Sequence, residues 1–122
     1  MIVTIATPYH TGQVRLTFHR YVYSGNHAIL IDELRGTPLF IASVNPPRMV
    51  LPRNQVAMKG WGENVGLPDA LVAAGVLEPS PVSVIPSGHV EIQVYRMTPF
   101  ALAEAYATAQ GTEMGGTGNV RT

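Results

Sequence analysis

The sequence predicts an α+β domain: an antiparallel sheet of about five strands, made of a meander and a hairpin, with one short central helix and one C-terminal helix. Apolar and polar residues alternate with a period of two over long stretches, which is typical of strands with one buried face. Segments 67–75 and 99–110 instead carry the start and stop residues of helices. We expect residues 1–111 to form this single domain and 112–122 to be a flexible glycine-rich tail.

The first half of the chain predicts a three-stranded antiparallel meander. After a short β-prone start at 1–7, apolar residues alternate with polar ones from Val14 onward. Turns rich in glycine, asparagine and proline then separate this strand from apolar runs at 28–31 and 39–44. The following segment, 45–55, contains three prolines, so we expect a loop that crosses the surface.

The stretch 56–66 contains the only tryptophan of the chain. Two glycines flank Trp61 and allow the indole to turn against a neighbouring surface, so we expect it to be buried in the core. Glu63 and Asn64 are expected to bond the free amides at the start of the short helix that follows, and Gly75 is expected to end it.

The last part of the chain predicts a hairpin followed by a helix. Segments 82–85 and 89–96 are separated by a Pro-Ser-Gly turn, and the second of them alternates between apolar and polar residues. Thr98 is a suitable N-cap for a helix that begins with Pro99, continues through an alanine-rich run and stops at Gly111.

Composition argues against several classes of function. Eight basic and eight acidic residues give no net charge, and neither sign forms a run, so nucleic acid is an unlikely partner on electrostatic grounds and so is an anionic membrane. The chain has no cysteine, which excludes disulfides and thiol catalysis. No apolar run approaches the ~18 residues of a membrane span, and no basic leader precedes an apolar stretch, so we expect a cytoplasmic protein.

No catalytic, metal or cofactor motif stands out. The four histidines are scattered without the spacing of metal ligands. Neither Ser24 nor Ser87 lies in a nucleophile elbow, and the tail glycines lack the Lys-Ser/Thr pair of a phosphate loop. We therefore expect a protein that is not an enzyme and needs no metal or cofactor.

Two regions are candidate binding surfaces. Four residues of the first long strand share the face opposite Val14, and they have the aromatic and guanidinium composition of recognition surfaces: Arg15, His19, Tyr21 and Tyr23. The alternative is that the C-terminal helix covers this face. The proline-containing loop adds Arg48 and Arg53 as a second candidate.

Four short segments resemble a family of small domains of unknown function that bacterial plasmids, phages and integrated mobile elements encode: NHAIL at 26–30, GTP at 36–38 leading to SVN at 43–45, MKGWGEN at 58–64 and LVAAGV at 71–76. The resemblance covers roughly residues 14 to 95 and transfers no catalytic residue. It implies a genetic context in which small neutral proteins often bind and obstruct a host protein.

The expected function is therefore that of a non-enzymatic accessory protein of a mobile genetic element that binds a host protein or protein complex. An inhibitor of host defence, such as an anti-CRISPR-like protein, fits this expectation. The alternative is a binder of single-stranded nucleic acid that uses Arg15, Arg20, Tyr21 and Tyr23 for stacking and phosphate contacts. Zero net charge argues against this alternative.

Overall fold

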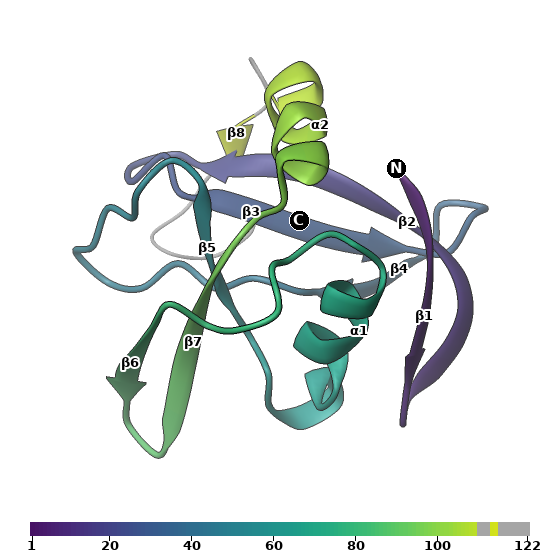
Figure 1. The fold of residues 1–122 in the computed structure, drawn as a ribbon, viewed down its shortest axis with the longest axis horizontal. Helices are drawn as coiled ribbons and strands as arrows, with labels where there is room; N and C mark the ends of the chain where they lie inside the picture. The colour runs from purple at the N-terminus through teal and green to yellow at the C-terminus, as the bar shows by residue number, and fades with distance from the viewer. Residues whose placement is uncertain (110–112, 115–122) are drawn as a thin grey trace.

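The computed structural model describes residues 1–109 and 113–114 of the chain (Figure 1). It confirms the predicted α+β class. The elements in chain order are β1 (Ile2–Thr7), β2 (His10–Tyr21), β3 (His27–Asp32), β4 (Pro38–Ile41), β5 (Gln55–Met58), the 3-10 turn η1 (Gly62–Asn64), α1 (Leu67–Ala73), β6 (Ser83–Ser87), β7 (Val90–Arg96), α2 (Pro99–Ala109) and β8 (Glu113–Met114).

The larger sheet has the strand order β1-β2-β3-β4, and β8 pairs in parallel with β2. The predicted meander is confirmed as β2, β3 and β4, and the β-prone start becomes β1, which pairs antiparallel with β2. Leu16 lies opposite Ile31 and Phe18 opposite Ile29, so each pair stacks two apolar side chains on one face. The alternating pattern of the sequence therefore sets both the register and the buried face.

A second sheet has the order β5-β7-β6. The predicted hairpin is confirmed as β6 and β7. Strand β5 was not predicted. It pairs with β7, so the hairpin belongs to a three-stranded sheet separate from the meander. Val56, Ala57 and Met58 are all buried, so β5 shows no alternation that sequence analysis could detect. A bridge between Ser43 and Met58 joins the two sheets.

The main core lies where the larger sheet, β5 and the two helices meet. Its fully buried side chains include Leu16, Ile29, Ile31, Val56 and Leu71. Helix α1 packs near β1, whereas α2 crosses β2 (Figure 1). The alanines that face this core are small, and Ala101 and Ala105 are fully buried, so α2 can approach the sheet closely.

The two helices are linked where one ends and the other begins. Gly75 takes a φ of 80° and ends α1 as predicted. The hydroxyl of Thr98 accepts the amide of Ala101, which confirms the predicted N-cap of α2, and donates to the carbonyl of Gly75 at 2.7 Å. The N-cap residue of α2 is therefore bonded to the glycine that ends α1.

The predicted cap of α1 is wrong. Gly66 takes the N-cap position with a φ of 83°, and no side chain caps the helix. Glu63 instead accepts a bond from the Lys59 ammonium at 2.9 Å, and the Asn64 amide donates to the carbonyl of Ile41 at 2.8 Å. Asn64 is buried, so its side chain fastens the turn before α1 to the larger sheet.

Trp61 is half-buried, so the prediction of a core residue is wrong. Its indole packs on a small cluster formed by Ala57, Ile92 and Val94 in the second sheet. Leu51 from the proline-containing loop packs on the same cluster. The second sheet thus has an apolar face of its own, which Trp61 and the loop cover.

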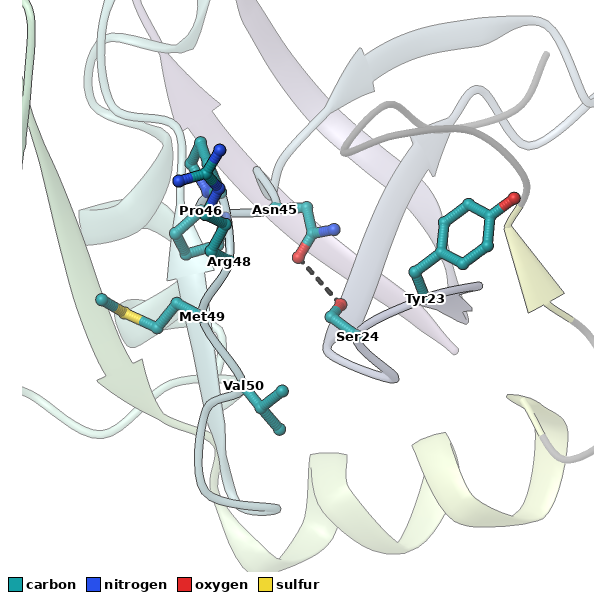
Figure 2. Close-up of a pocket in the computed structure, with 8 residues that line it drawn as sticks. Tyr23, Ser24, Asn45, Pro46, Arg48, Met49 and Val50 are labelled. Atoms are coloured by element: carbon teal, nitrogen blue, oxygen red, sulfur yellow. Dashed lines mark hydrogen bonds between the residues drawn. The ribbon is translucent and has the colours of Figure 1, made fainter.

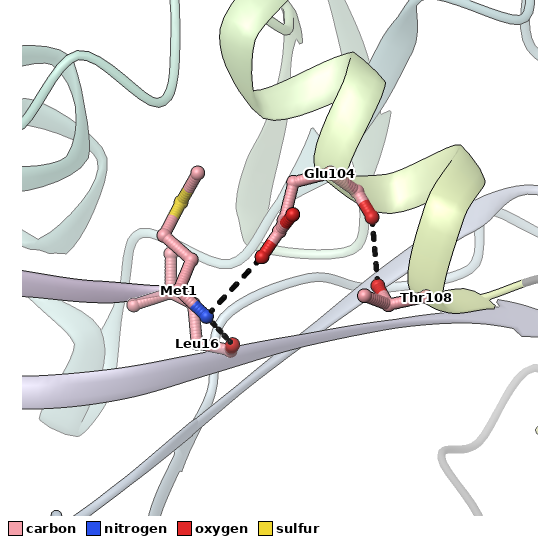
Figure 3. A network of polar contacts seen from close by, with 4 residues as sticks. All are labelled: Met1, Leu16, Glu104 and Thr108. Atoms are coloured by element: carbon pink, nitrogen blue, oxygen red, sulfur yellow. Dashed lines mark hydrogen bonds and ion pairs between the residues drawn. The ribbon is translucent and has the colours of Figure 1, made fainter.

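Helix α2 also contacts the start of the chain (Figure 3). The ammonium of Met1 lies 3.6 Å from the carboxylate of Glu104 and 3.3 Å from the carbonyl of Leu16. The hydroxyl of Thr108 donates to the backbone carbonyl of Glu104 at 2.7 Å. The Met1 ammonium thus links α2 to β2, whereas the Thr108 bond lies within α2.

Of the predicted tail at 112–122, the structure describes only Glu113 and Met114, which form β8 opposite Arg20 and Tyr21. The predicted flexibility of 112 and 115–122 lies outside the described residues. Within the described ranges, neither helix is long and apolar enough to cross a membrane.

Candidate functional site

The structure separates the six predicted binding residues. Tyr23 and Arg48 come together in one pocket, and Arg53 lies in an adjoining hollow. Arg15 and His19 lie elsewhere on β2, beside Met1 and α2. The remaining residue, Tyr21, is buried.

Tyr21 is a correction to the predicted surface. It is only 1% exposed, packs with Ala28 and Leu30, and shares a hydrogen bond of 3.2 Å with the Ser43 hydroxyl. Burial raises the pKa of this phenol, and the bond to Ser43 opposes the shift. At Tyr21, the face of β2 opposite Val14 is thus part of a small apolar cluster. Tyr21 therefore cannot serve as an exposed anchor.

The alternative, in which the C-terminal helix covers that face, is also wrong. Helix α2 contacts the opposite face of β2, where Leu16 and Phe18 share the main core with α2. On the same face the guanidinium of Arg20 lies 5.1 Å from the centre of the Tyr106 ring.

Arg15 and His19 belong to a polar group that includes Asp32. Arg15 lies opposite Asp32 in the β2–β3 pair, and a ring nitrogen of His19 lies 3.2 Å from the Thr17 hydroxyl. Burial lowers the pKa of His19, and the charge of Asp32 opposes this shift. Burial raises the pKa of Asp32, and His19 and Arg15 oppose that shift. Arg15 and Asp32 thus bring opposite charges into one group.

A pocket of about 500 Å³ lies between the β2–β3 turn and the proline-containing loop (Figure 2). We call it the Tyr23 pocket, and we call residues 45–53 the proline loop. The residues that line the Tyr23 pocket are Tyr23 and Ser24 from the turn, and Asn45, Pro46, Pro47, Arg48, Met49 and Val50 from the proline loop. In Figure 2 the loop residues lie along one wall and Tyr23 stands on the other.

The three prolines of the proline loop have no backbone N–H, so the loop cannot pair as a strand. Its remaining polar groups therefore need hydrogen-bond partners from other parts of the chain. Asn26, which is 4% exposed, supplies them. Its amide nitrogen donates to the side-chain oxygen of Asn45 at 2.9 Å and to the carbonyl of Met49 at 2.8 Å. Its amide oxygen accepts the backbone N–H of Leu51 at 2.8 Å. One buried side chain therefore fixes both ends of the pocket wall.

Two further features define that wall. The Ser24 hydroxyl donates to the same Asn45 oxygen at 2.9 Å, which ties the turn to the loop (Figure 2). Arg48 has a φ of 57°, a left-handed conformation that costs a non-glycine residue about 1–2 kcal/mol. The bonds to Asn45 and Met49 flank Arg48 and hold this conformation in place.

The pocket presents apolar side chains to solvent. Tyr23 is 80% exposed, Val50 74% and Met49 38%. Arg48 is the one charged residue that lines the pocket, and the Ser24 hydroxyl is engaged with Asn45. The arrangement therefore offers contact area and a cation rather than an activated nucleophile.

A smaller hollow of about 180 Å³ adjoins the pocket and shares Ser24 and Val50 with it. Here a ring nitrogen of His27, Nε2, lies 2.6 Å from the carbonyl of Arg53, and the Tyr106 hydroxyl donates to the same oxygen at 3.3 Å. Since a carbonyl only accepts, Nε2 carries the proton. The His27 and Tyr106 rings meet edge to face, with centroids 5.9 Å apart.

The surroundings of His27 favour its neutral form. Burial lowers the pKa of its imidazole; the bond to the Arg53 carbonyl opposes this shift, and the nearby charge of Arg20 adds to it. Its other ring nitrogen is buried and has no hydrogen-bond partner among the described residues, so a second proton there would be unsatisfied.

Sequence analysis missed the residues that build this site. Asn26 was interpreted as a turn residue, and His27 as one of four scattered histidines. Their partners lie 19 to 26 positions away along the chain, which no local pattern reveals. The proline content of the loop was the one available signal, since it implies that side chains elsewhere must satisfy the backbone.

A scan against protein-family models, a search of curated proteins and a search of solved structures each found no match. Within residues 1–109 and 113–114, no group of three or more acidic or histidine side chains is placed to hold a metal ion.

Asn26→Ala should lower the free energy of unfolding by about 2–4 kcal/mol, because it removes three hydrogen bonds and leaves buried loop groups unpaired. Urea denaturation of the purified variant measures this loss. Asn54→Ala, a change at an exposed asparagine of the same region, should stay within about 0.5 kcal/mol of wild type. Equal losses in the two variants would contradict the role of Asn26.

His27 should make the fold less stable in mild acid. Its pKa is lowered from 6.5 in the folded chain, so the unfolded chain binds more protons as the pH falls below about 6.5, and the thermal midpoint should drop. His27→Gln keeps an N–H donor but cannot titrate, so its midpoint should fall less between about pH 7 and pH 5.5. His89→Gln, at an exposed histidine, should follow wild type. The same pH dependence in all three proteins would exclude His27 as its source.

Proposed function

We propose that this chain is a non-enzymatic accessory protein of a mobile genetic element, and that it binds a host protein through the Tyr23 pocket. The observation that carries the binding proposal is the pairing of exposed apolar side chains with a fixed backbone. Tyr23, Met49 and Val50 surround a pocket whose wall a buried asparagine holds. The mobile-element context rests on the resemblance of segments 26–30, 36–45, 58–64 and 71–76 to domains that such elements encode.

The pocket has the composition of a protein interface. Tyrosine, methionine and arginine are enriched in the centres of interfaces, and exposed apolar groups gathered around a concavity mark binding sites. A wall that is already ordered loses little conformational entropy when a partner binds. Asn26, Ser24 and the flanking bonds at Arg48 supply that order.

Single-stranded nucleic acid is the weaker candidate. One of the four residues that would form its stacking strand, Tyr21, is buried. Arg15 lies in a different hollow from Arg20 and Tyr23. These placements favour protein binding through the pocket.

The more specific role that we propose is inhibition of a host defence complex, such as a CRISPR effector. A host with an active CRISPR system and a targeted plasmid provides the assay. Expression of wild type should restore transformation by that plasmid, and expression of Tyr23→Ala should restore much less. Equal restoration by wild type and Tyr23→Ala would count against the pocket as the binding site. No restoration by either protein would count against this role.

Tyr23→Ala should weaken binding to a partner captured from the host and then purified by at least about tenfold, as expected for the loss of an aromatic anchor. The matched control is Tyr9→Ala, because Tyr9 is 63% exposed but lies in the β1–β2 turn. Calorimetry with the purified partner measures both affinities. A partner that responds to Tyr9→Ala and not to Tyr23→Ala would place the interface elsewhere.

A further inference from the structure

We propose that the partner segment is acidic: an apolar side chain fills the Tyr23 pocket, and carboxylates beside it bind Arg20 and Arg53 of the adjoining hollow. This inference rests on the proposed function and specifies the chemistry of the partner at the same site. The two hollows are continuous, because they share Ser24 and Val50. A segment seated in one of them is in reach of the other.

Charge is distributed unevenly around these hollows. The chain as a whole has eight basic and eight acidic residues. The residues that line the two hollows include Arg20, Arg48 and Arg53 and no aspartate or glutamate. The two ion pairs found among the described residues join Met1 to Glu104 and Lys59 to Glu63, so neither involves these arginines. The lining of the two hollows is thus positively charged in a chain with no net charge, and the acidic residue Glu113 lies opposite Arg20 in the β2–β8 pair.

Two of the arginines are positioned by contacts: Arg53 through its backbone carbonyl, and Arg20 through an aromatic ring that its guanidinium packs on. The carbonyl of Arg53 accepts bonds from His27 and Tyr106, which fixes the base of its side chain. The guanidinium of Arg20 lies over the Tyr106 ring. A guanidinium that packs its face on an aromatic ring keeps its N–H edges for acceptors, and those edges match the two oxygens of a carboxylate.

The combination favours an acidic protein segment over nucleic acid. The pocket of about 500 Å³ is walled by proline, methionine, valine and tyrosine side chains, which suit an apolar anchor. Nucleic-acid grooves instead carry positive charge along an extended track, and the whole chain has no net charge. A segment with an apolar side chain for the Tyr23 pocket and carboxylates for Arg20 and Arg53 fits both hollows together.

Selection of phage-displayed random dodecapeptides on the immobilised wild-type chain tests this inference. Enriched peptides should combine a large apolar residue with nearby aspartate or glutamate. A fluorescein-labelled synthetic copy should bind wild type, and replacing its acidic residues by their amides should weaken binding about tenfold or more. Arg53→Gln should weaken it to a similar extent, and Arg35→Gln, at an exposed arginine of the β3–β4 turn, should not.

The outcomes separate this inference from the proposed function. Peptides that require Val50, as shown by their loss on Val50→Asp, but lack acidic residues and ignore Arg53→Gln would overturn the acidic partner and keep the pocket. A selection that yields no peptide dependent on Val50 would overturn both. Binding of labelled oligo(dT) that Arg53→Gln abolishes and salt releases would assign these arginines to nucleic acid instead. Arg53 is exposed, so its replacement should leave the fold intact, and a thermal melt checks this.

Discussion

The hydrogen bonds of the Asn26 side chain are the interaction on which the arrangement of the site depends. A loop with three prolines has lost the donors that would let it pair as a strand, so its remaining polar groups need partners from elsewhere. Asn26 provides one donor group and one acceptor from a buried position and uses both. His27, the next residue, bonds the Arg53 carbonyl. The start of β3 is therefore the anchor of the proline loop.

This anchoring explains how apolar side chains of the loop stay exposed to solvent instead of being buried in the core. The loop places Leu51 on the apolar face of the second sheet, beside Trp61, and directs Met49 and Val50 toward the pocket. Bonds from Asn26 to the side chain of Asn45 and to the carbonyl of Met49 lie on the two sides of Arg48 and hold its left-handed conformation. Fold and candidate site are thus connected, because the segment that covers the second sheet is also the wall of the pocket.

Local signals in the sequence were sufficient for most elements. Alternation predicted β2 and β7, and Gly75 and Thr98 marked the end of one helix and the start of the other. Features that depend on long-range contacts were not predictable in this way. Strand β5 is buried on both faces and follows a run of prolines, and Tyr21 is buried by neighbours in β3 and by Ser43. The site was half anticipated: Tyr23, Arg48 and Arg53 were named, but the residues that bring them together were not.

The central claim is that the proline loop is a rigid, preformed surface. Backbone ¹⁵N order parameters of the isolated chain test it most directly, with Met49, Val50, Leu51 and Arg53 as reporters, since each has an amide proton. We expect values of about 0.85, as in regular secondary structure, because Asn26 and His27 bond this segment at Met49, Leu51 and Arg53. Values below about 0.6 at these residues would contradict the account, because a loop that moves freely cannot present a fixed pocket wall.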